Sequence, residues 1–180
     1  MIYRQEVRRN RNSPTILYTQ EAKGHLVKVM PGAFINSEVP ISYVSVMQWI
    51  SKKQSQVVMN LISALSFHEM TTQIPAYLSV ALPRGAYLPK VNILPVKVCY
   101  ITKKLLTHGF EMHEGLFGPF RVTTKERTLV DCFKYRNKIG LNIFLEALRM
   151  GKSQIDLWKL EDEARLLRVI KQITPYLESN

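Results

Sequence analysis

Short elements with strong turn signals are expected near the N-terminus. Ser13-Pro14 is a helix start signal, so a short helix is predicted over residues 15–22. Two runs of β-forming residues, 26–30 and 33–35, then flank Pro31-Gly32. Proline followed by glycine is typical of a type II turn, so the two runs are predicted to pair as a β-hairpin.

The stretch from 39 to 69 has the periodicity of a helix. Its apolar residues recur at intervals of three and four positions, at Val44, Met47, Ile50, Val58, Leu61, Ile62 and Leu65. Thr71-Thr72 and Pro75 end this pattern. Residues 77–82 and 96–102 then resemble two buried strands, and glycines separate further short strands up to Val122.

Helices are expected from residue 123 to the end. Thr123 and Glu126 have the spacing of a capping box, with threonine at the N-cap. The helix that they open is expected to reach about Gly140, and an apolar stripe over 141–151 predicts the next one. Ser153 is expected to cap a last helix, which Pro175 limits. Strands followed by helices predict an α+β fold.

The charge of the chain narrows the class of partner. Its 180 residues are 46% hydrophobic, enough for one domain with a sizeable core, yet the net charge is +11. Residues 1–36 carry six basic and two acidic side chains, and residues 84–140 carry eleven and four. Such an excess favours phosphate-rich partners, and the second block is compatible with the nucleotide pocket of a partner protein, with RNA or with solvent.

The first basic block predicts contacts with DNA. Arginine and lysine side chains bind phosphates or base edges, and a basic hairpin can enter a groove. The alternative is a solvated terminus, the usual place of arginine-rich chain ends. The candidate DNA-binding residues are Arg8, Arg9, Arg11, Tyr18, Lys23 and Lys28.

No catalytic constellation stands out, so an enzyme is not expected. His68-Glu69 is a tight pair of histidine and carboxylate, and no nucleophile on a strained turn accompanies it. His68 is therefore expected to bond backbone or side-chain partners at a helix end. A metal-dependent nuclease is a remote alternative, with Glu111, Glu114 and Asp131 as loose candidate ligands. The acids over 156–163 are better explained as a solvated helix face, and no metal or cofactor is predicted.

The compartment follows from what the chain contains. Cys99 and Cys132 are isolated and read as thiols of a reducing compartment. No apolar run approaches the roughly 18–20 residues of a membrane helix, and the basic N-terminus has no hydrophobic signal region. A cytoplasmic protein without membrane contact is predicted.

Two stretches resemble a known family. LSFHEMTTQIP (65–75) and RVTTKERTLVDCFKYRNKIG (121–140), continued by LEALR (145–149), are similar to the AbiEi-like antitoxins. The closing residues 168–170 and 175–178 are similar too, so the resemblance covers roughly residues 55–180. It implies an N-terminal winged helix-turn-helix that binds repeats in the operon's own promoter. It also implies a following domain that counteracts a nucleotidyltransferase-type toxin of a type IV toxin–antitoxin, or abortive-infection, operon.

The resemblance divides the chain into two parts. Residues 1–38 are expected to form a partial winged helix-turn-helix, with the recognition helix and the wing, and residues 39–180 an α+β antitoxin domain. Residues 24–29 resemble the first strand of the wing, and 32–34 its close. The family-motif residues, expected to be structural, are His68, Thr71, Thr123, Glu126, Arg127 and Asp131.

Two questions stay open at the level of sequence. Arg127 and Asp131 are four residues apart, either as a surface pair worth at most about 0.5 kcal/mol or as an inward anchor. Only 23 residues precede Gly24, fewer than the family's two or three helices need. Either the winged helix is cut short or the natural start lies upstream. The alternatives to an autorepressor and antitoxin are thus an antitoxin or interaction module without sequence-specific DNA binding, and the nuclease.

Overall fold

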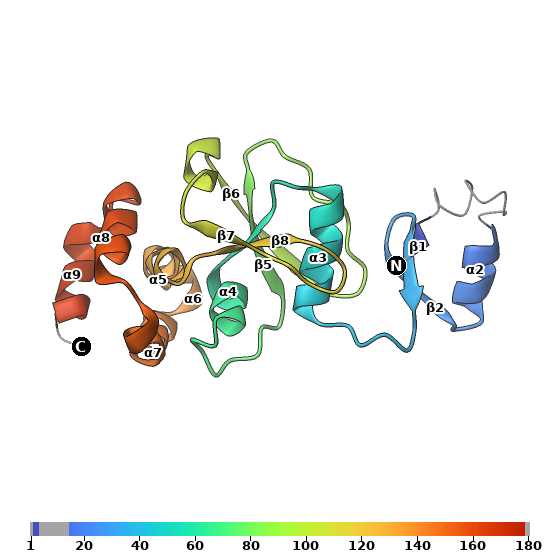
Figure 1. Ribbon diagram of the computed structural model, residues 1–180, viewed down its shortest axis with the longest axis horizontal. Helices are drawn as coiled ribbons and strands as arrows, with labels where there is room; N and C mark the ends of the chain where they lie inside the picture. The colour runs from blue at the N-terminus through green and yellow to red at the C-terminus, as the bar shows by residue number, and fades with distance from the viewer. Residues whose placement is uncertain (1, 4–14, 179–180) are drawn as a thin grey trace.

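The elements follow one another along the long axis of the molecule. The computed structural model describes residues 2–3 and 15–178. At one end lie an N-terminal helix and hairpin, in the middle a mixed sheet with α3, and at the other end the C-terminal helices (Figure 1). This arrangement is the predicted α+β fold that ends in a run of helices.

The N-terminal end is a small antiparallel sheet with one helix beside it. The helix α2 (Thr15–Ala22) precedes the hairpin strands β2 (Leu26–Met30) and β3 (Ala33–Asn36), which confirms both predictions. A short strand, β1 (Ile2–Tyr3), pairs with β3, so the order is β1-β3-β2.

The central sheet has five strands in the order β6-β5-β4-β8-β7. Its middle strand, β4 (Val58–Met59), is antiparallel to β5 (Leu78–Pro83) and parallel to β8 (Phe120–Thr123). On the outside, β6 (Val96–Ile101) runs parallel to β5 and β7 (Phe110–His113) antiparallel to β8. A 3₁₀ turn, η1 (Lys103–Leu106), connects β6 to β7.

The predicted helical stretch 39–69 is wrong at its centre. Helices α3 (Tyr43–Lys53) and α4 (Leu61–Phe67) form there, but Val58 belongs to β4 and pairs with Ala81. A short apolar run has no decisive period, and here hydrogen bonds to strands on both sides select the extended form.

One core joins the hairpin to the sheet. Val29 and Ile35 of the hairpin, Trp49 of α3 and Val80 of β5 are all buried in the same apolar cluster. Strand β5 is buried throughout, as predicted, whereas β6 is half-exposed because it lies at the sheet edge.

The C-terminal helices pack with α4 around a second core. They are α5 (Lys125–Lys134), α6 (Arg136–Ile139), α7 (Leu141–Gly151), α8 (Leu157–Leu166) and α9 (Ile170–Glu178), with η2 (Lys152–Gln154) before α8. In the described part of the chain no helix combines the length and apolarity needed to cross a membrane.

Two predicted helix boundaries need correction here. Asp156, not Ser153, caps α8, because its carboxylate accepts from the N–H groups of Trp158 and Lys159. Pro175 lies inside α9 instead of ending it. Its ring is exposed, and the helix continues through it although proline has no N–H to donate.

Candidate nucleic-acid interface and the buried polar network

The end of α2 sets the geometry of the N-terminal candidate site. The N–H of Gly24 donates to Glu21 O at 2.9 Å, and that of His25 donates to Gln20 O at 3.0 Å. This pair of bonds is a Schellman motif, and it needs a left-handed residue at Gly24, which has φ 77°. His25 Nδ1 also lies 2.7 Å from Gln20 Oε1. The chain is thereby turned from the helix directly into β2.

Helix and hairpin share one surface around Tyr18. The ring of Tyr18 meets Phe34 edge-on, with centroids 5.4 Å apart. Lys28 Nζ lies 5.4 Å from the centre of the same ring. Lys23 is fully exposed at the end of the helix, while Leu17 packs inward. Of the predicted DNA-binding residues, Tyr18 and Lys28 are thus in contact with each other. Lys23 is exposed directly after the last residue of α2.

The other predicted DNA-binding residues, Arg8, Arg9 and Arg11, lie outside the described residues. The hairpin itself is held on the main domain by its buried side and by a hydrogen bond from Asn92 N to Val29 O at 3.1 Å. The predicted boundary near residue 38 therefore crosses a continuous core.

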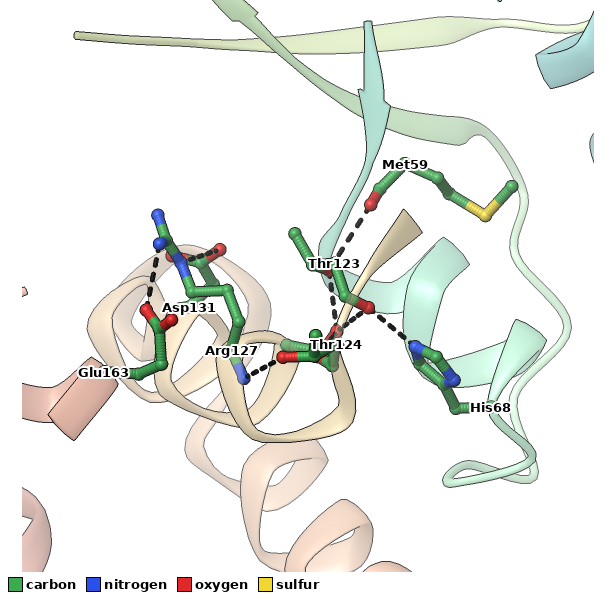
Figure 2. Close-up of polar contacts among 8 residues, drawn as sticks. Met59, His68, Thr123, Thr124, Arg127, Asp131 and Glu163 are labelled. Carbon is green, nitrogen blue, oxygen red and sulfur yellow. Dashed lines mark hydrogen bonds and ion pairs between the residues drawn. The ribbon is translucent and has the colours of Figure 1, made fainter. Parts of the chain in front are cut away.

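Four of the six family-motif residues, His68, Thr123, Arg127 and Asp131, belong to the buried polar network shown in Figure 2. Arg127 is only 2% exposed, so it is the inward anchor and not a surface residue. Its Nε donates to Asp131 Oδ2 and its Nη1 to Glu163 Oε2, both at 3.0 Å. The expectation that Glu163 belongs to a solvated face is wrong, because it turns from α8 toward α5.

Opposing electrostatic effects act on Asp131. Burial raises the pKa of its carboxyl, while the Arg127 charge and hydrogen bond favour the ionised form and oppose that rise. Glu163 adds a second negative charge on the other side of the guanidinium. A buried arginine with two carboxylates satisfies its donors well, and its removal leaves two carboxylates without their cation.

The start of α5 differs from the predicted capping box by one residue. Thr124 is the N-cap and accepts from Arg127 N at 3.3 Å, whereas Thr123 ends strand β8. Glu126 does not reach back; its Oε1 accepts from Asp156 N at 3.1 Å. The strand holds Thr123 in place, since its hydroxyl donates to Met59 O and bonds the Thr128 hydroxyl at 2.7 Å.

His68 bonds a backbone group at the end of α4, in agreement with its predicted role. Its Nε2 donates to Thr123 O at 2.7 Å, which requires the hydrogen on Nε2 (Figure 2). Burial lowers the pKa of His68, although the bond to the carbonyl acts in the opposite direction. The ring therefore favours the neutral form.

The two family-like stretches contact each other a second time at Glu146. Its Oε1 accepts from the Thr71 hydroxyl, the Thr72 hydroxyl and the Thr72 N–H, at 3.0, 2.9 and 2.7 Å. These hydrogen bonds lower the pKa of Glu146. Thr71 thus bonds a side chain of α7, and its partner Glu146 was not singled out from the sequence.

An open cleft of about 620 Å³ lies beside the network, between β7, α5 and α8. Most of its carboxylates already have partners. Glu126 accepts from the backbone N–H of Asp156, Glu163 pairs with Arg127, and Asp162 pairs with Arg165. Over residues 2–3 and 15–178, no three side chains of histidine, cysteine, aspartate or glutamate form a group that could hold a metal ion.

Sequence reasoning also passed over two exposed aromatic residues of the central domain. Tyr87 and Tyr100 are 72% and 51% exposed, and they line one hollow with Arg84. Their signal in the sequence is the absence of acidic residues around them.

In comparisons with known proteins, no family model matches the chain, and the search of curated proteins finds no match.

Proposed function

We propose that this protein is the antitoxin and DNA-binding autorepressor of a type IV toxin–antitoxin operon. The observation that carries the proposal is the joint surface of α2 and the basic hairpin, where Lys28 leans over Tyr18. A helix followed by a basic hairpin is the closing half of a winged helix-turn-helix, whose helix reads the major groove beside the wing.

The surroundings of this surface support the same proposal. Side chains of the hairpin are packed in the main core, and this close packing fixes the position of the proposed wing on the domain. The strand β1 joins the far side of the hairpin and widens it into a three-stranded sheet. Promoter repeats in duplex DNA are the proposed ligand, and the cytoplasm is the proposed compartment.

The antitoxin activity is proposed from the family resemblance of residues 55–180. The hydrogen bond from His68 to Thr123 and the contact of Thr71 with Glu146 join the two resembling stretches, so both stretches serve to build one domain. The proposed partner is a nucleotidyltransferase-type toxin encoded in the same operon. Co-expression with that toxin is expected to restore growth, and growth arrest that persists would contradict the antitoxin role.

The decisive experiment for DNA binding is an anisotropy titration at physiological salt. Labelled duplex DNA from upstream of the gene is compared with a shuffled duplex of equal length. A preference of about 10³ or more for the native duplex is expected of a specific repressor. Equal, weak and salt-sensitive binding to both would instead support an antitoxin or interaction module without sequence-specific DNA binding.

A nuclease remains testable in the same samples. Asp131, the central candidate ligand, is buried and already accepts from Arg127, so it does not offer an open metal site. Incubation with Mg²⁺ or Mn²⁺ is expected to leave the DNA intact. Metal-dependent cleavage that Asp131→Ala abolishes would contradict the proposal.

A further inference from the structure

The middle of the chain has an unusual charge. Residues 70–110 contain five basic residues and no acidic one. This segment supplies β5, the loop that follows it, the edge strand β6 and η1. A surface built from it attracts polyanions without local acids to repel them.

A tight turn at the end of β5 forms one wall of a hollow. The N–H of Ala86 donates to Pro83 O, and that of Arg84 donates to Ile101 O, both at 3.1 Å. Gly85 has φ 83° and allows this turn, which brings the loop back over the end of β6. Gln54 Nε2 donates to Tyr87 O at 2.9 Å and fixes the loop beyond the turn.

The hollow between this loop and β6 has a volume of about 650 Å³. Tyr87 stands on the loop wall and Tyr100 on the strand, and both are exposed. The lining is completed by Arg84, Gly85, Ala86, Leu88 and Val98. Two open aromatic rings, an apolar floor and a guanidinium thus lie in one place without a carboxylate.

We propose that this hollow binds single-stranded nucleic acid. Unpaired bases stack on tyrosine rings, and the arginine binds the phosphates between them. Bases inside a duplex are already stacked and cannot use these rings, so the site is distinct from the helix and hairpin proposed for promoter DNA. The proposal does not rest on the antitoxin function.

The surroundings allow a strand to extend beyond the hollow. Among the described residues β6 is an edge strand, and no strand of residues 2–3 or 15–178 closes that side of the sheet. Tyr87 also borders a second hollow, of about 260 Å³, with Met30, Pro31, Lys53 and Pro89. The path from Tyr100 past Tyr87 therefore leads toward the turn of the N-terminal hairpin.

The test is an anisotropy titration of the full chain with short labelled oligouridylate and oligothymidylate. Tyr87→Ala and Tyr100→Ala are each expected to raise Kd by about tenfold, because base stacking on an aromatic ring is lost. Arg84→Ala is expected to weaken binding and to flatten the salt dependence by about one phosphate contact. All three side chains are exposed, so thermal melts should stay close to wild type.

Matched controls separate stacking from simple charge attraction. Tyr100→Phe keeps the ring and is expected to bind as wild type does, and Lys171→Ala removes an exposed charge on α9 with little effect. Equal binding of the two oligonucleotides supports recognition of bases and phosphates alone, whereas preference for the RNA supports an added 2′-hydroxyl contact. Absent binding, or binding that both tyrosine-to-alanine variants leave unchanged, overturns the proposal.

The two nucleic-acid proposals fail in different ways. Tyr87→Ala should not alter the preference for the native promoter duplex over the shuffled one. Conversely, Lys28→Ala should weaken duplex binding and spare oligouridylate. Loss of both activities in Tyr87→Ala would show that one surface serves both ligands, and would contradict a separate single-strand site.

Discussion

The cations of the helix and hairpin, Lys23 and Lys28, differ from Arg127 in their burial and in their ion pairing. Lys23 is exposed, and Lys28 contacts only the face of an aromatic ring among the interactions described above. Arg127 is buried and held by Asp131 and Glu163. Each of these cations adds one positive charge to the net charge, yet only the two lysines can attract a polyanion. Net charge is thus informative about partners only after the buried, paired cations are set aside.

The largest effect expected from this comparison is the loss of stability in Arg127→Met. The buried carboxylate of Asp131 and the partly buried one of Glu163 lose their cation, which should lower the free energy of unfolding by about 3–5 kcal/mol. Chemical denaturation measures it. Arg165→Met on α8 is the control, since Arg165 is exposed and its ion pairs with Glu161 and Asp162 are worth about 0–1 kcal/mol. Equal losses in both variants would erase the distinction between the buried and the exposed cations.

The next effect concerns binding and leaves stability almost unchanged. Lys23→Ala combined with Lys28→Ala should flatten the log–log salt dependence of promoter binding by about 2, one phosphate per lysine. The free energy of unfolding should change by less than about 1 kcal/mol, because the ring contact of Lys28 is the main interaction removed. An unchanged slope would mean that neither lysine lies on the DNA.

The buried side of the comparison should also depend on pH through His68. Its pKa is lower in the folded than in the unfolded protein, so the unfolded chain takes up a proton first as the pH falls. Stability should therefore decline below about pH 6.5, with a slope of at most about 1.4 kcal/mol per pH unit from this group. In His68→Gln the decline should be smaller, and in the control His25→Gln, an exposed position, unchanged. Identical pH profiles in wild type and His68→Gln would contradict this.

The smallest effect is expected at Glu146, where solvent screens the charge. The pKa of Glu146 is lowered on folding, so its contribution is present above the unfolded pKa and is lost as the pH falls through the folded pKa. Glu146→Gln should cost less than about 1 kcal/mol at neutral pH and nothing in acid. Thermal melts at both pH values test this, and a difference that persists in acid would place the effect outside the carboxylate.

What could be predicted from the sequence follows the range of the interactions involved. The hairpin around Pro31-Gly32 and the helix over 15–22 depend on local turn and start signals, and both are confirmed. The strand at Val58 depends on partners at Ala81 and beyond, and its local pattern indicated a helix. Likewise the capping position moved from Thr123 to Thr124, because Thr123 is needed by the sheet.

The candidate site shows the same limit. The spacing of Arg127 and Asp131 predicts a pair, but only the position of α8 adds Glu163 as a third, partly buried member. Glu146 was missed because its partners are more than 70 residues away. By contrast, the absence of acidic residues from 70–110 is visible in the sequence. That Tyr87 and Tyr100 line the same hollow becomes visible only in the folded structure.

The two-residue strand β4 has a consequence for how the chain is made. It is the middle strand of the sheet, and its parallel partner at Val122 is encoded more than 60 residues later. A nascent chain that has not reached β8 therefore holds β4 and β5 with one buried edge unpaired, and such edges recruit other chains. Ribosome stalling or proteolysis before residue 120 should thus yield aggregating fragments, because β8 is then missing from the sheet.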